Sequence, residues 1–148
     1  FSGRVDSVNA AGNSLVVFGV TIRVNSLTRF EDHSGADVQR FSLANVAVGD
    51  YVEVDAYNDG SGLLATKLER DDSQGEVQLE GVAQNVAAPN FTIGGVAVTT
   101  DGSTEFRDTN SVTISAAAFF QAAPGRQVKA RGSLAGNVVL ATRAELED

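Results

Sequence analysis

The chain has 148 residues, 43% of them hydrophobic, with 15 Gly, 2 Pro and neither Cys nor Met. Without cysteine, disulfides, thiolate metal sites and a cysteine nucleophile are excluded, and no stretch approaches the roughly 18 apolar residues of a membrane span. The net charge of −8 argues against nucleic acid as a partner, because binding to a phosphate backbone requires a basic surface.

The first half of the chain predicts five strands and one short helix. Alternating apolar residues indicate the strands, and turn residues separate them. The predicted strands are residues 3–8, 14–18, 20–24, 50–57 and 63–70. Residues 38–45 fit a short helix, and the tract 29–37 before it is predicted to be an irregular loop.

The second half repeats the first at a nearly constant offset. Gly49 and Thr66 return 76 residues later as Gly125 and Thr142, whereas Gly3 returns 78 residues later as Gly81. The second copy predicts its helix over residues 115–123, which are rich in alanine, the best helix former. Its least regular loop is expected at residues 107–113.

Three strands, a short helix and two further strands within about 75 residues is the order of an OB-like closed barrel. An immunoglobulin-like sandwich is the alternative, but it needs about seven strands in about 100 residues. We therefore predict an all-β fold with two tandem OB-like five-stranded barrels, residues 1–72 and 77–148, joined by a linker at 73–76. Because no methionine occurs and both ends fall at repeat edges, we expect the chain to be part of a longer protein.

Two motifs are similar to those of a known family: Val-Gly-Asp-Tyr-Val-Glu-Val at residues 48–54 and Leu-Leu-Ala-Thr-Lys-Leu-Glu at 63–69. With the Gly-x-Val opening strand and Thr-x-Phe, they resemble the bacterial repeat family known only as domain of unknown function fifty-six sixty-six. The resemblance implies OB-like barrels in series on exported or lipid-anchored envelope proteins. A periplasmic, cell-surface or secreted location is therefore expected. The second copy departs from the pattern at the fourth strand.

The sequence predicts no catalytic residue, no metal site and no cofactor. His33, the only histidine, lies in a polar loop without an evident nucleophile or orienting partner. Gly94-Gly95 is predicted to be a hairpin turn rather than a phosphate cradle. Two oxygen-rich groups do not follow the spacing of the calcium-binding loop: Asp55, Asn58 and Asp59, and Glu31, Asp32 and Asp37.

One strand face of the first copy is a candidate binding site. Alternation along the fourth strand predicts that four side chains point outward: Tyr51, Glu53, Asp55 and Tyr57. Tyrosines between carboxylates can stack on and hydrogen-bond a neutral sugar or a basic peptide. An ordinary solvated strand face is the alternative interpretation.

Five charged positions change sign between the copies, and this suggests an interface. An acidic surface on one copy and a basic surface on the other would suit a head-to-tail protein contact. Free drift of solvated charges is the alternative. The pairs, first copy before second, are Arg29/Glu105, Glu31/Arg107, Asp50/Arg126, Glu53/Lys129 and Asp55/Arg131.

From these observations we expect a non-enzymatic cell-envelope module that acts as a spacer, a scaffold or a protein-interaction unit. The expected partner is another protein or the repeats of the chain itself. The alternative is a ligand-binding barrel for carbohydrate or peptide.

Overall fold

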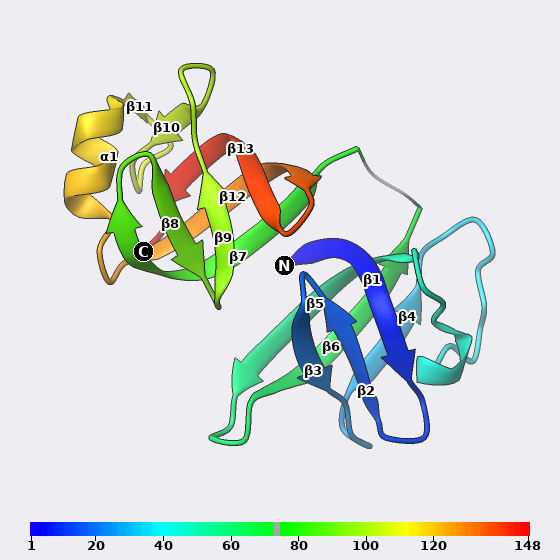
Figure 1. The fold of residues 1–148 in the computed structure, drawn as a ribbon. Coiled ribbons are helices and arrows are strands. Elements are labelled where there is room, and N and C mark those ends of the chain that lie inside the picture. Colours follow the sequence, from blue (N-terminus) through cyan, green and yellow to red (C-terminus); the bar gives the residue numbers. More distant parts are fainter. Residues whose placement is uncertain (73–74) are drawn as a thin grey trace. The chain divides into compact units, whose positions relative to one another are not determined.

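The computed structural model describes residues 1–72 and 75–148 (Figure 1). The chain divides into two compact units, Phe1–Gly75 and Glu76–Asp148. Part of the predicted linker, Ser73 and Gln74, lies outside the described residues. Each unit consists mainly of β-strands.

The first unit is a closed five-stranded barrel with one additional strand. The strands of the barrel follow the order β1–β2–β3–β6–β5, and β5 pairs with β1 to close the ring. All neighbours are antiparallel except β3 and β6, which are parallel. The strands are β1 (Ser2–Asn9), β2 (Ser14–Val17), β3 (Val20–Arg23), β4 (Arg29–Asp32), β5 (Tyr51–Asn58) and β6 (Leu63–Asp71).

The second unit repeats this topology. Its barrel order is β7–β8–β9–β13–β12, with β12 pairing β7, and the parallel neighbours are β9 and β13. This is the strand order of the OB fold, so the predicted pair of OB-like barrels is confirmed. The strands are β7 (Val77–Ala87), β8 (Asn90–Ile93), β9 (Val96–Thr99), β10 (Glu105–Arg107), β11 (Thr113–Ile114), β12 (Gln127–Ala135) and β13 (Val138–Leu146).

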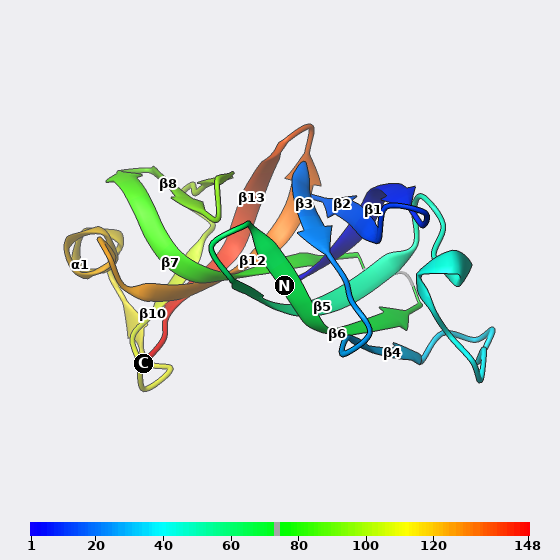
Figure 2. The ribbon, with the colours of Figure 1, turned by 90° about the horizontal axis from the view of Figure 1, so that it is seen from below.

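The irregular loops predicted at residues 29–37 and 107–113 contain strands instead. In the first barrel, β4 runs parallel to β6, and β10 occupies the same place beside β13 (Figure 2). Each strand places one phenylalanine, Phe30 or Phe106, among the apolar residues of its barrel. Each of these two short strands has a single apolar residue, Phe30 or Phe106, among charged ones, so neither shows the apolar alternation by which a strand is recognised.

The residues that the two copies share make the same backbone contacts. The Thr28 hydroxyl donates a hydrogen bond to the carbonyl oxygen of Ala65, and Thr104 donates to Ala141, both at 2.7 Å. The Thr66 hydroxyl likewise donates to a carbonyl across the bulge where β5 and β6 shift register, at 3.1 Å. The repeated motifs are therefore explained by the frame of the barrel.

Gly49 and Gly125 turn the chain into the fourth barrel strand of each copy. Their φ angles are 89° and 75°, a region that a residue with a Cβ rarely adopts. The Gly49 N–H donates to the carbonyl of Val5, and Gly125 donates to Ala83, at 2.8 and 3.0 Å. The positive φ explains why both copies have glycine at this position.

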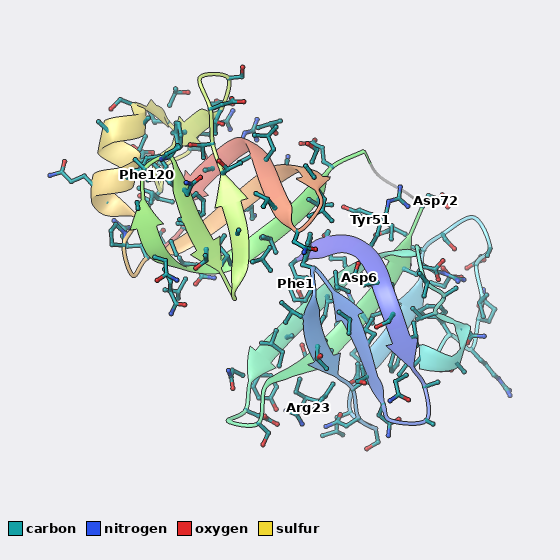
Figure 3. All side chains as sticks on the ribbon, viewed as in Figure 1. Phe1, Asp6, Arg23, Tyr51, Asp72 and Phe120 are labelled. Atoms are coloured by element: carbon teal, nitrogen blue, oxygen red, sulfur yellow. The ribbon has the colours of Figure 1, made fainter. Side chains whose placement is uncertain are left out.

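A helix closes one end of the second barrel. Helix α1 (Ala116–Ala122) starts after Ser115, whose side chain accepts a hydrogen bond from the Ala118 N–H. Phe119 is fully buried, with its ring centroid 5.0 Å from that of Phe106. Figure 3 labels the adjacent Phe120, which also packs on Phe106. The predicted helix at residues 115–123 is thus present.

The first barrel has only one turn of 3₁₀ helix, η1 (Leu43–Asn45), where a helix over residues 38–45 was expected. An ionic network lies there instead. The Arg70 guanidinium contacts the carboxylates of Asp32 at 2.7 Å and Asp50 at 3.3 Å, and lies 4.7 Å from the centre of the Phe41 ring. Since Asp32 also accepts from the Val38 N–H, this network holds residue 38 in a non-helical connection.

Candidate functional site

The outer face of β4, β6 and β5 in the first barrel carries a cluster of charged side chains. Opposed residues on neighbouring strands point to the same side of a sheet. The register aligns Glu31 on β4 with Glu69 on β6 and Glu53 on β5, and Asp71 lies two residues beyond Glu69. We call these four carboxylates, Glu31, Glu53, Glu69 and Asp71, the acidic patch.

Lys67 and His33 contact two members of the acidic patch. The Lys67 ammonium forms a short ion pair with Glu69 and lies 3.8 Å from Glu31. The hydrogen bond between Lys67 and Glu69 lowers the pKa of the glutamate and raises that of the lysine. His33, directly after β4, has its imidazole 3.2 Å from Glu31 and 3.9 Å from Glu69.

Two overlapping groups in this region could hold a divalent cation. In each group the potential ligand atoms lie within 4.8 Å of one another: Glu31, His33 and Glu69, and Glu53, Glu69 and Asp71. Carboxylate oxygens and imidazole nitrogens are common metal ligands. The Lys67 ammonium, however, already supplies a positive charge to the first group. The absence of a metal site stays a prediction.

The second barrel neutralises the equivalent surface. Arg107, Lys129, Glu145 and Glu147 occupy the positions of the acidic patch. The ladder aligns both Arg107 and Lys129 with Glu145, and the Lys129 ammonium is 4.0 Å from Glu147 and 3.9 Å from Glu80. Four carboxylates in the first barrel thus correspond to two carboxylates and two cations in the second.

The predicted binding face of β5 is not continuous, and the outward exposure predicted for Tyr51 is wrong. Tyr51 (labelled in Figure 3) is buried, with 8% of its surface exposed, while Tyr57 is 51% exposed. Strand alternation predicts on which side of the sheet a side chain lies. It does not predict how much of that side chain is covered by neighbouring residues. The bulge after Asp55 also shifts the register before Tyr57. Only Glu53 and Asp55 lie exposed between the tyrosines.

Most of the predicted interface residues are engaged within their own barrel. Arg29 pairs with Glu31 at 3.0 Å, and in the second barrel the same ion pair is formed in reverse order by Glu105 and Arg107 at 2.8 Å. The Arg131 guanidinium donates to the Gln78 side chain at 3.2 Å. Asp50 belongs to the Arg70 network, and Arg126 is exposed. A head-to-tail contact through these residues stays a prediction.

Sequence reasoning missed the central members of the site. It assigned none of Lys67, Glu69, Asp71 and His33 to a binding surface. A prediction of β4 would have placed Glu31 and His33 beside Glu69. The pairing of β4 with β6 aligns Phe30, of the Thr-x-Phe motif, with Leu68 and so aligns Glu31 with Glu69. The signal was the repeated motif itself, which marks the same additional strand in both copies.

Two other sequence candidates have structural roles. Gly94 and Gly95 have φ angles of 57° and 83° and join β8 to β9, as expected for a hairpin turn. Asp59, in the β5–β6 turn, pairs with Arg23. A groove of about 530 Å³ in the second barrel, lined by residues 82–86, Pro124 and Gly125, was not foreseen.

The chain belongs to the family described as Domain of unknown function (DUF5666), whose model matches residues 2–69 and 80–145. The two matched segments correspond to the two barrels. No curated protein and no solved structure matches the chain significantly. None of the helices in the described residues is long and apolar enough to span a membrane.

Proposed function

We propose that this chain is a non-enzymatic module of the cell envelope that acts as a protein-interaction unit. Its contact surface is the acidic patch of the first barrel, and its partner presents a positively charged surface. The envelope location is inferred from the resemblance to exported and lipid-anchored repeat proteins, and the exported location remains part of the proposal.

One observation carries this proposal: the same barrel frame supports two different outer faces. In the second barrel Arg107 and Lys129 lie beside Glu145 and Glu147, whereas in the first barrel Glu31 and Glu53 stand in their places. Clustered like charges raise the energy of the isolated surface, and a complementary partner removes that cost. Such a contact favours fast, salt-sensitive association.

The second candidate, a carbohydrate or peptide site on the tyrosine and acid face of β5, has weaker support. A stacking platform requires exposed aromatic rings, and Tyr51 is buried. Tyr57 alone remains as an exposed aromatic side chain on this strand. We therefore prefer the acidic patch as the site.

Affinity capture from cells that produce the chain tests the proposal. The variant Glu53→Gln/Asp71→Asn removes two patch charges without breaking an ion pair of the first barrel described above. The matched control, Glu80→Gln/Glu147→Gln, makes the same change of net charge beside Lys129 of the second barrel. Capture of a basic protein should be lost with the first variant and kept with the control.

Salt provides an independent readout, because exposed charges are screened within about 8–10 Å at physiological ionic strength. Capture by the wild-type chain should fall steeply between low and high salt. Equal capture by wild type and the patch variant, or capture only in a cytoplasmic fraction, would contradict the proposal.

A further inference from the structure

The two barrels differ at one sheet edge. In the second barrel β10 is flanked on both sides, by β13 and by the short antiparallel strand β11, which aligns Ile114 with Phe106 and Thr113 with Arg107. Across the described residues of the first barrel, the equivalent strand β4 pairs with β6 alone. Figure 2 shows β4 beside β6, with the chain leaving it toward η1.

In the second barrel, β11 pairs with one edge of β10. The free edge of β4 presents the equivalent backbone groups. The His33 N–H donates to the Arg70 carbonyl at 2.7 Å, so the backbone groups of alternate residues, including Glu31, face β6. Those of Phe30 and Asp32 face away from β6. In the second barrel the Asp108 N–H, equivalent to that of Asp32, donates to the Val112 carbonyl at 2.9 Å.

The side chains along β4 define the strand that fits this edge. By the pattern of β11, an incoming antiparallel strand needs an apolar residue opposite Phe30, as Ile114 is opposite Phe106. Glu31 favours a cation opposite, and Arg29 favours an anion. The strand β4 of a second copy meets all three requirements when it runs antiparallel and is centred on Phe30, because Arg29 of each copy then lies opposite Glu31 of the other.

We propose that the β4 edge of the first barrel pairs with β4 of a second copy of this chain in a two-fold symmetric dimer. The inference goes beyond the proposed function, because this contact uses the edge of β4 and leaves Glu53 and Asp71 free to meet a basic partner. A two-fold contact uses the same surface on both copies and closes at two. With four residues on each side and exposed charges, the dimer is weak and sensitive to salt.

Sedimentation equilibrium of the full chain, up to about 1 mM protein, measures this dimer directly. Either Arg29→Glu or Glu31→Arg places like charges opposite each other twice per dimer, and should raise the dissociation constant about tenfold or more. The combined variant Arg29→Glu/Glu31→Arg restores opposite charges and should recover the wild-type constant within about threefold. It also reproduces the order that Glu105 and Arg107 have in the second barrel.

Backbone pairing is tested by comparing Phe30→Pro with Phe30→Ala. Both variants lose the ring, but only proline removes the N–H that faces the free edge, leaving the bonds of residues 29 and 31 to β6 in place. Circular dichroism reports whether each variant is folded. The proline variant should dissociate at concentrations at which the alanine variant still dimerises. If Phe30→Pro does not fold, the charge-exchange series decides the matter.

Three results would overturn the proposal: a monomer throughout the concentration range, single reversals without effect, or a combined variant that does not recover. These outcomes are separate from a failure of the proposed function. A monomeric chain that still captures a basic protein through Glu53 and Asp71 would refute self-pairing and leave the interaction role intact. A dimer broken by single reversal and recovered by the combined variant, with no basic protein captured, would support self-pairing and refute the interaction role of Glu53 and Asp71.

Discussion

Thr28 and Thr104 show how single residues define the family frame. Both hydroxyls donate to an alanine carbonyl at 2.7 Å, and each also accepts a backbone N–H from the residue three positions earlier, Asn25 or Asp101, at 3.0 Å. The side chain thereby fixes the turn and ties it to the last strand of the barrel. The hydrogen bonds of this repeated threonine thus give it a structural role in both barrels.

Replacement of this threonine should have the same cost in both barrels. Thr28→Val and Thr104→Val keep the shape but remove the hydroxyl, so each should lower the free energy of unfolding of its barrel by about 1 kcal/mol or more. Denaturant unfolding of the full chain measures both. A loss at Thr28 with none at Thr104 would show that the shared motif does not have a shared role.

Gly49 should resist substitution because of its backbone conformation. The φ angle is 89°, and no atom beyond the two neighbouring residues lies within 4 Å of the position that a Cβ would take. The penalty therefore arises from the left-handed conformation and not from a steric clash. Gly49→Ala should therefore cost about 1 kcal/mol or more. Gly35→Ala is the control, since Gly35 does not have a positive φ and its Cβ would make an ordinary contact. Equal melting temperatures for the two variants would refute this account.

The two barrels close one end with different elements. Helix α1 inserts Phe119 into the second barrel, whereas the first barrel uses Arg70 with Asp32 and Asp50 beside Phe41. Position 70 corresponds to Leu146, which is buried in the second barrel. An apolar end suits a helix, while a charged end requires the hydrogen bonds that the irregular loop supplies.

Arg70→Leu, which copies the second barrel, should destabilise the first. The side chain of Asp32 is fully buried, and loss of its cationic partner leaves a buried charge uncompensated, at a cost of at least about 2 kcal/mol. Both tyrosines of the chain, Tyr51 and Tyr57, lie in the first barrel, so tyrosine fluorescence reports its unfolding. Adding Asp32→Asn should recover part of the loss; no recovery would argue against coupling between the two residues.

Acid should weaken the first barrel through Asp32. The Arg70 hydrogen bond, aided by those from Ser34 and Val38, holds the pKa of Asp32 well below its ordinary value. Since the folded pKa lies below the unfolded value of about 3.9, the stabilisation is present above about pH 4 and is lost as the pH falls further. The free energy of unfolding, measured by tyrosine fluorescence, should decline below this pH in wild type and decline less in Asp32→Asn. Parallel decline in both would exclude Asp32 as the cause.

The elements that the sequence predicts well are the long strands and the alanine-rich helix. β5 and β6 each span eight or more residues, so the alternation of Val52, Val54 and Leu68 is unambiguous. β4 was missed because Phe30 is its only apolar residue, so it shows no apolar alternation. The helix expected near residue 40 was wrong because Arg70, much later in the chain, sets the local structure. The acidic patch depends on β4, and for that reason it could not be assembled from the sequence.

At the scale of the whole chain, two barrels with one frame carry different outer surfaces. The shared glycines and threonines maintain the frame, and the substitutions Glu31/Arg107 and Glu53/Lys129 change the charge that it displays. A duplicated domain allows one copy to retain a neutralised face while the other presents a binding surface. Under the proposed function, recognition belongs to the first barrel.

Zero-length carbodiimide cross-linking tests the claim most directly, because it joins a carboxylate to a lysine only when the two are in contact. The chain should be cross-linked in producing cells and the joined residues identified by mass spectrometry. Cross-links from Glu53 and Asp71 to lysines of a partner should predominate over those from Glu145 and Glu147. Cross-links distributed evenly over both barrels, or found only on the second barrel, would contradict the account.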